Sequence, residues 1–173
     1  MAIIKPNNNT LSAVTALPSA IATGKVLQVI QSVSTYSFTT TSGSFVDIES
    51  ASGTDWETAI TPSATSSKIL ILLNIPVTGS NSGAAQNRGG FELQEKIAAG
   101  SYASKMETFI GNFDYGGSGV QMNQNCNLVF LSSPSTTSAC TYKARVNSSG
   151  GTSMNVSGSS DINSTITLME IAG

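Results

Sequence analysis

Short stretches of alternating apolar and polar residues recur along most of this chain, separated by turns rich in glycine, serine and proline. This period of two is found in residues 25–31, 35–40, 45–49, 91–97, 102–110, 120–130, 140–146, 154–156 and 166–171. Side chains of a β-strand point alternately to opposite faces of a sheet, so each stretch is predicted to be a half-buried strand. After residue 24 no segment sustains the 3.6-residue period of an amphipathic helix.

The longest apolar run, residues 68–76, does not alternate. It contains Ile69–Leu73 and is bounded by turn signals at Pro62 and Gly79. A continuous run of this length predicts a central strand that is buried on both faces. It is too short for a membrane span, which needs about 20 apolar residues.

About eight to ten such strands with frequent turns predict two packed antiparallel sheets. The predicted fold is therefore all-β: a jelly-roll-like antiparallel β-sandwich over residues 25–173, with an extended N-terminal arm. The immunoglobulin type of sandwich is the alternative. Residues 78–90 and 112–119 are rich in glycine, serine and asparagine, and are predicted to be long loops.

Residues 1–24 form a separate unit in the sequence. They contain two prolines, three consecutive asparagines, and four apolar residues spaced about one helical turn apart, namely Leu11, Val14, Leu17 and Ile21. So short a segment cannot bury these side chains by itself. We therefore predict an attachment arm whose apolar residues dock on a partner protein. The alternative is an arm that folds back on its own domain.

Charged residues make up only 10% of the chain, against about 25% in an average soluble domain. The net charge is −2 and the eight basic residues are scattered, which argues against nucleic-acid binding and against membrane insertion. The sequence has no histidine, the commonest general base and a frequent zinc ligand. No cofactor and no metal site are expected.

Two cysteines, Cys126 and Cys140, both occupy inward positions of the alternating pattern. If they faced each other across a hairpin they could form a disulfide. The alternative is a pair of buried free thiols.

Four blocks of the sequence stand out: KVLQVIQ (25–31), ITPSATSSKILI (60–71), LSSPSTTS (131–138) followed by TYK (141–143), and TLMEI (167–171). Together they resemble a family of modules from tailed bacteriophages, notably marine and cyanobacterial phages. Members are tail-fibre or virion structural proteins. The resemblance covers residues 24–173 and implies a jelly-roll domain, typically a homotrimer, that an N-terminal segment displays on the particle surface.

The expected function is therefore that of a virion structural protein, a trimeric tail fibre or fibre-tip module for host attachment, assembled in the host cytoplasm. Residues 1–24 would bind other virion proteins. Arg88, Asp114 and Tyr115 in the two glycine-rich loops suit contacts with a host surface glycan or receptor; ordinary solvated loops are the alternative. A second candidate function is a capsid decoration (cement) protein that stabilises the head shell.

Catalysis is not expected. Glycoside hydrolysis uses two carboxylates about 5–10 Å apart, and Asp47 with Glu49, or Asp55 with Glu57, would be the candidate pairs. Residues two apart on a strand share one face, and two acids on an outward face are typical of solvated residues. We therefore predict that the protein is not an enzyme.

Overall fold

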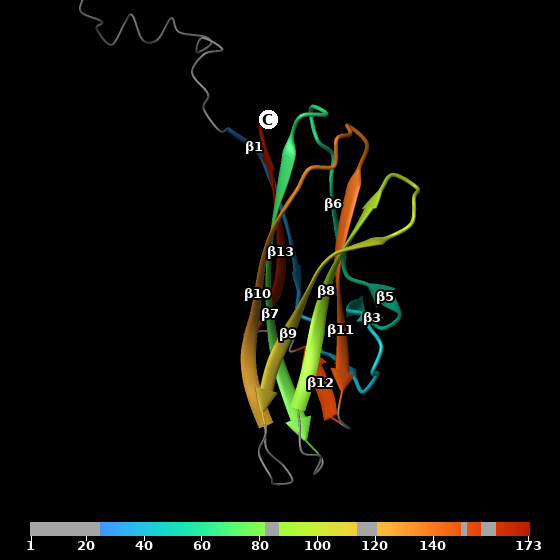
Figure 1. Cartoon of the computed structure of the whole chain (residues 1–173), viewed down its shortest axis with the longest axis vertical. Helices are drawn as coiled ribbons and strands as arrows, with labels where there is room; N and C mark the ends of the chain where they lie inside the picture. The colour runs from blue at the N-terminus through green and yellow to red at the C-terminus, as the bar shows by residue number, and fades with distance from the viewer. Residues whose placement is uncertain (1–24, 82–86, 114–120, 150–151, 157–161) are drawn as a thin grey trace, which may run out of the picture.

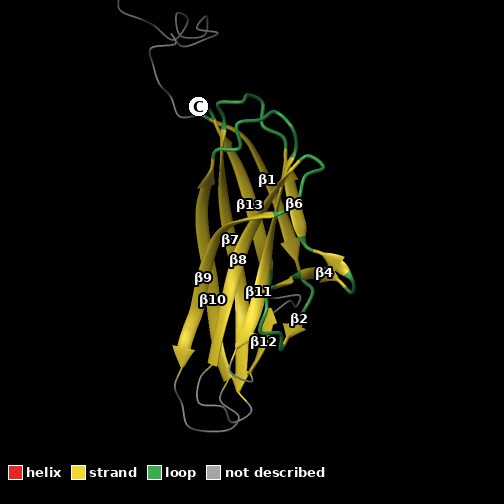
Figure 2. Ribbon diagram, turned by 45° about the vertical axis from the view of Figure 1, so that its right-hand side comes forward, coloured by secondary structure: helices red, strands yellow, loops and turns green. Residues whose placement is uncertain are grey.

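The computed structural model describes residues 25–81, 87–113, 121–149, 152–156 and 162–173, and all regular secondary structure in these ranges is β-strand. Sheet A comprises β1 (Val26–Ser34), β2 (Phe38–Thr40), β7 (Lys68–Asn81), β10 (Gln121–Ser132), β12 (Thr152–Val156) and β13 (Ser164–Ile171). Sheet B comprises β3 (Val46–Asp47), β6 (Glu57–Ile60), β8 (Asn87–Ile97), β9 (Ala103–Phe113) and β11 (Cys140–Ser149). A small hairpin pairs β4 (Glu49–Ala51) with β5 (Thr54–Asp55). The two sheets lie against each other with their strands along the long direction of the domain (Figure 1, Figure 2).

The order of the main strands is that of a jelly roll. Sheet A has the order β1-β13-β7-β10, and sheet B has the order β6-β11-β8-β9, with every pair antiparallel. Counted along the chain, the eight main strands are β1, β6, β7, β8, β9, β10, β11 and β13. Sheet A thus contains the first, eighth, third and sixth of them in spatial order, and sheet B the second, seventh, fourth and fifth. An immunoglobulin sandwich instead pairs its first strand with its second. The predicted all-β jelly-roll sandwich is therefore confirmed, and the immunoglobulin alternative is wrong.

The strand β7 is central in sheet A, as its apolar run predicts, but it is not buried on both faces. One edge of β7 pairs with β10, and the other pairs first with β13 and then with β12. Ile69 and Ile71 point into the core and are fully buried, whereas Leu70 and Leu72 lie half-buried on the outer face. A two-layer sandwich covers only one face of each sheet, so the prediction of two buried faces was wrong.

The stretch predicted as a loop over residues 78–90 is mostly strand. β7 continues to Asn81 and β8 begins at Asn87, so Arg88 lies in a strand rather than in a loop. Its neighbour Gly89 is there because space is short: a Cβ atom would lie 2.8 Å from Cε of Met154 and 3.0 Å from the carbonyl oxygen of Asn147. Glycine here therefore marks close packing against the facing sheet and the neighbouring strand, although its low β-propensity suggested a loop.

The core lies between the two inner faces and is formed by aliphatic and aromatic side chains of both sheets. Its largest members include Trp56, Phe91, Tyr142, Met154 and Leu168. Trp56 follows the β4–β5 hairpin, and its Nε1 donates to Oγ of Ser32 in β1 at 3.1 Å. That bond ties the connection between the first two main strands to sheet A.

Both cysteines are buried free thiols. Cys126 lies in β10 of sheet A and Cys140 in β11 of sheet B, so they do not face each other across a hairpin as proposed. The chain crosses from one sheet to the other between these consecutive strands. Burial raises the pKa of the Cys126 thiol to about 11, which makes it a poor nucleophile at neutral pH.

Candidate functional site

The domain has two ends that differ in what the chain brings to them. At one end, the arm end, the backbone N–H of Ala172 donates to the carbonyl of Lys25 at 2.9 Å, so residue 25 and the C-terminus lie side by side (Figure 1). At the opposite end, the loop end, Asn87 at the start of β8 pairs with Phe113 at the end of β9. Lys25 and Ala172 therefore lie at the end of the domain opposite Asn87 and Phe113.

The residues predicted to bind partners are placed only in part. Leu11, Val14, Leu17 and Ile21 lie outside the described residues, and so do Asp114 and Tyr115. The backbone of Arg88 pairs with Asn112 of β9 and with Ser149 of β11. Of the three predicted receptor residues the structure therefore places only the backbone of Arg88, in β8 at the loop end.

At the arm end, one buried carboxylate holds three segments together. Glu170 of β13 is only 1% exposed. Its Oε1 accepts hydrogen bonds from the backbone N–H and the hydroxyl of Ser63, at 2.7 and 2.6 Å, and its Oε2 accepts one from Nε2 of Gln28 at 2.7 Å. Gln28 also donates to the carbonyl of Thr61 at 2.7 Å. Glu170 therefore fixes the β6–β7 connection against β1 and β13.

These contacts join three of the sequence blocks described above. Gln28, Ser63 and Glu170 come from three different blocks, and they meet at a single carboxylate. Burial by itself would raise the pKa of Glu170, but the hydrogen bonds from Ser63 and Gln28 reverse the shift and lower it to about 2. Glu170 is thus a structural anion at neutral pH.

A second buried carboxylate, Glu95 of β8, lies between the sheets near the same end. It accepts hydrogen bonds from Oγ of Ser132 at 2.5 Å and from the phenol of Tyr142 at 2.7 Å, and pairs with Nζ of Lys105 at 2.5 Å. Burial opposes ionisation of Glu95, but Lys105 and these hydroxyls outweigh it and hold the pKa below its ordinary value. Glu95 thereby links β8, β9, β10 and β11 across the sandwich.

The acids considered as a catalytic pair have other partners. Lys143 of β11 lies between Asp47 and Asp55, with Nζ 2.8 and 3.1 Å from their carboxylate oxygens. Glu49 accepts a hydrogen bond from the backbone of Gly53 at 3.1 Å. Glu57 accepts a hydrogen bond from the phenol of Tyr102 and forms an ion pair with Lys96. Neither pair therefore has two carboxylates facing a common open space.

These residues belong to a charged network that covers the outer face of sheet B. We call it the charged face, and define it by Asp47, Asp55, Glu57, Glu92, Lys96, Tyr102, Lys143 and Arg145. Arg145 pairs with Glu92 at 2.9 Å and with Asp47 at 3.2 Å. The ring of Tyr102 lies against two cations, with Nζ of Lys143 4.2 Å and Nζ of Lys96 4.5 Å from its centroid. Each of the three cations thus has at least one acid partner, and with four acids the charged face keeps a net charge of −1.

The outer face of sheet A is different, because its outward side chains are almost all uncharged. Near the arm end it has an apolar half, formed by Val26, Leu27, Val29, Leu70, Leu72, Val129, Leu131, Met169 and Ile171. Toward the loop end it has an amide half, formed by Asn74, Pro76, Thr78, Asn123, Asn125, Asn127 and Thr165. Lys68, at the margin of the apolar half, is the one charged residue on the outward positions of β7, β10 and β13 that the structure describes.

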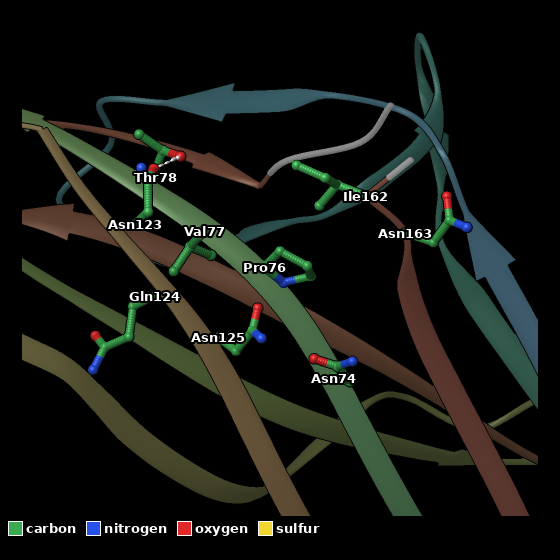
Figure 3. A pocket seen from close by; sticks show the side chains of 9 residues that line it. All are labelled: Asn74, Pro76, Val77, Thr78, Asn123, Gln124, Asn125, Ile162 and Asn163. Carbon is green, nitrogen blue, oxygen red and sulfur yellow. Dashed lines mark hydrogen bonds between the residues drawn. The ribbon is translucent and has the colours of Figure 1, made fainter. Parts of the chain in front are cut away.

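A groove of about 600 Å³ opens on the amide half (Figure 3). It is lined by Asn74, Pro76, Val77, Thr78, Asn123, Gln124, Asn125, Ile162 and Asn163. Oγ1 of Thr78 donates to Oδ1 of Asn123 at 2.7 Å, which fixes the orientation of that amide. An amide can donate and accept at once, so the groove suits an uncharged polar ligand.

In the part of the chain that the structure describes, no group of three or more histidine, cysteine, aspartate or glutamate side chains could hold a metal ion. No helix long and apolar enough to cross a membrane occurs among the same residues.

No family model and no curated protein match the sequence. Among solved structures, that of the Gt strain of infectious bursal disease virus aligns with 86% of this chain and 39% of its own, with a TM-score of 0.38 and 12% identity. The VP2 subviral particle of the same virus aligns with 83% of this chain and 39% of its own, with a TM-score of 0.34 and 12% identity. This chain spans about two fifths of the length of the chains that it matches. The jelly-roll assignment therefore depends on the strand order of this chain itself.

Sequence reasoning missed the buried carboxylates and the uncharged face. Glu95 and Glu170 fall on inward positions of alternating strands, in phase with Leu93 and Leu168, so their burial was visible in the pattern. The apolar outer face of sheet A was also visible in the sequence. Residues 68–76 do not alternate, so this strand has apolar side chains on both of its faces. What the sequence lacked was the register that aligns these residues across four strands.

Proposed function

We propose that this protein is a structural component of a tailed-bacteriophage virion, displayed on the particle surface as a small trimeric tail-fibre or fibre-tip module for host attachment. Residues 1–24 bind other virion proteins, and the loop end faces the host. The observation that carries the proposal is the opposition of the two ends: residue 25 leaves the domain at the arm end, while Arg88 and the end of β9 lie at the loop end.

This arrangement suits a display module physically. The arm end is braced by Glu170, whose bonds to Ser63 and Gln28 connect β13 with the β6–β7 connection and β1. A load applied through residues 1–24 enters at β1 and passes directly into this network. The jelly-roll core then supports the loop end as a rigid platform, and binding residues commonly lie on loops held by such a scaffold.

The ligand at the loop end is a neutral host glycan in this proposal. The amide groove lies in the half of sheet A nearest that end, and its lining combines amides with the apolar surfaces of Pro76 and Ile162. Sugars present both hydroxyl groups and apolar C–H faces, so this mixture matches them chemically. No catalytic role is included, because Asp47, Asp55 and Glu57 are held in the charged network.

Capsid decoration is the second candidate function, since the same opposition of the ends would let the arm clamp neighbouring capsid subunits. Copy number distinguishes the two. A tail appendage is expected in tens of copies per particle, and a decoration protein in hundreds. Quantitative mass spectrometry of purified particles, with the major capsid protein as the internal standard, gives this number directly.

The test of the proposal removes the apolar residues of the arm from the full-length protein, produced in infected cells that lack the wild-type copy. The variant replaces Leu11, Val14, Leu17 and Ile21 with serine, and the matched control replaces Ser12, Thr15, Ser19 and Thr23 with alanine. The variant is expected to fold but to be absent from purified particles, whereas the control is incorporated. Normal incorporation of the serine variant would contradict attachment through the arm.

A further inference from the structure

The apolar half of sheet A has no counterpart on the rest of the described surface. We propose that it is the surface through which copies of this chain bind one another. The inference rests on the self-association that the proposed function includes, and names the residues that carry it. It concerns only the outer face of β1, β13, β7 and β10, not residues 1–24 or the loop end.

Cross-strand register aligns the apolar side chains into rows. One complete row runs from edge to edge of the four strands: Val29 pairs with Met169, Met169 with Leu70, and Leu70 with Leu131. The next row adds Leu72 paired with Val129. Within the row, neighbouring side chains lie about 4.5–5.5 Å apart, so they form one continuous apolar surface.

These side chains reach solvent to an unusual degree for aliphatic residues. Val129 is 61% exposed, Val29 55% and Leu131 49%. Isolated exposed aliphatic residues are normal, but a contiguous group of them marks an interaction surface. Their arrangement on two edge strands, with Leu70, Leu72 and Met169 between them, makes a broad and flat surface rather than a cleft.

The size and polarity of this face fit a protein interface. Four strands about 4.8 Å apart and about nine residues long at 3.4 Å per residue span roughly 19 by 30 Å, or about 600 Å² in plan. Projecting side chains expose more area than the plan, which approaches the roughly 800 Å² that each partner buries in a stable complex. The apolar half supplies an interface core, and the amide half supplies a polar rim.

Charge identifies the partner as a second copy. Three such faces can meet around a threefold axis without burying an unpaired charge, because Lys68 lies at the margin and the remaining outward side chains of β7, β10 and β13 are neutral. A lipid surface fits less well, since the apolar half has no tryptophan or tyrosine and few basic residues around it. The charged face would place Lys143 and its acids in any contact, so it is a poorer surface for self-association.

The experiment is sedimentation velocity of the full-length protein and two variants, from about 1 to 100 µM. The interface variant carries Val129→Glu and Leu131→Glu. The matched control carries Phe109→Glu, because Phe109 of β9 is 86% exposed and belongs to sheet B. The wild type and the control are expected at about three times the 17.8 kDa chain mass. The interface variant is expected at the mass of one chain, with association weakened at least about 100-fold by like charges placed at the contact.

A milder variant keeps the test valid if the double glutamate variant does not fold. Val129→Thr with Leu131→Thr retains residues that favour strands and removes apolar surface only. It is expected to weaken association about 10-fold, with an unchanged far-ultraviolet circular dichroism spectrum. An unchanged association constant for this folded variant would overturn the proposal.

The other outcomes also decide the question. If the wild type and the glutamate variant are equally oligomeric, copies bind through another surface, and the proposed virion role is untouched. If the wild type is monomeric at 100 µM and a chain lacking residues 1–24 associates, those residues cover the face and a second copy does not. If both are monomeric, the face does not mediate self-association. Loss of the virion role would instead appear in the incorporation experiment with the arm variant.

Discussion

The outer faces of sheets A and B differ in the kind of side chain that they expose to water. The outer face of sheet B holds most of the charged side chains of the described chain, and each cation there has at least one acid within 4 Å. The outer face of sheet A has rows of valine, leucine and methionine beside rows of asparagine and threonine. The cations of the charged face thus have acid partners within their own chain, whereas the apolar half of sheet A is the surface that we propose binds a second copy.

The contrast extends to how much each face contributes to the stability of the single chain. On the charged face, Lys143 is only 6% exposed, and it is covered by the Tyr102 ring and by two aspartates. Removing a partner from a buried ion pair leaves charges without compensation. On the apolar half of sheet A, side chains project into solvent, and changing them leaves the core of the chain intact. Substitutions should therefore separate stability from association.

The largest effect on stability is expected from Lys143→Ala. The substitution removes the cation from Asp55, leaves Asp47 with Arg145 alone, and removes the contact of Lys143 with the Tyr102 ring. Because both aspartates are partly exposed, the free energy of unfolding should fall by about 2–3 kcal/mol rather than more. The control is Lys96→Ala, whose pair with Glu57 is 3.7 Å long and partly exposed, and whose loss should cost less than about 1 kcal/mol. Urea unfolding at neutral pH measures both. Equal losses would mean that burial of Lys143 has no energetic consequence.

The next effect is expected from Glu170→Gln, which replaces charge-assisted hydrogen bonds at the arm end by neutral ones. A loss of about 1–2 kcal/mol at pH 7 is expected. Because the pKa falls from 4.5 to about 2 on folding, the carboxylate stabilises the fold fully above pH 4.5, and this contribution declines as the pH falls toward 2.

Thermal unfolding of the wild type and Glu170→Gln between pH 7 and pH 2 measures this dependence. The difference between the two melting temperatures should shrink as the pH falls through that window, since the glutamine side chain does not titrate. A difference that stays constant down to pH 2 would contradict an ionised Glu170 in the folded protein.

The smallest effect on stability is expected on the outer face of sheet A. Leu131→Thr should change the free energy of unfolding of the isolated chain by no more than about 0.5 kcal/mol, as is usual for exposed positions. Unfolding under conditions in which the protein is monomeric measures this value. A loss above 2 kcal/mol would show that Leu131 stabilises its own chain, and the contrast between the faces would fail.

The fold could be predicted from the sequence because the alternating pattern marks most strands. The errors came where a residue type had a tertiary role. Gly89 was assigned to a loop, but it lies in β8 because Met154 and Asn147 leave no room for a Cβ atom. Leu70 and Leu72 were assigned to a buried face, although a two-layer sandwich leaves that face outside.

The candidate site could be predicted less well, since it depends on which strands are neighbours. Arg88 lies in β8, and no local pattern in the sequence shows that this strand pairs with β9, whereas Asp114 and Tyr115 lie outside the described residues. Glu170 is likewise separated from Ser63 by more than 100 residues, and meets it through the jelly-roll order of the strands. Contacts between distant segments of this kind are not encoded in any local pattern.

The most direct test of the central claim is cryo-electron microscopy of the intact particle, at a resolution that distinguishes the two ends of the domain. The account predicts density for this domain on the particle surface, with the arm end, where Lys25 meets Ala172, against the virion and the loop end of β8 and β9 pointing outward. Density with the loop end against the particle, or particles without the domain, would contradict it.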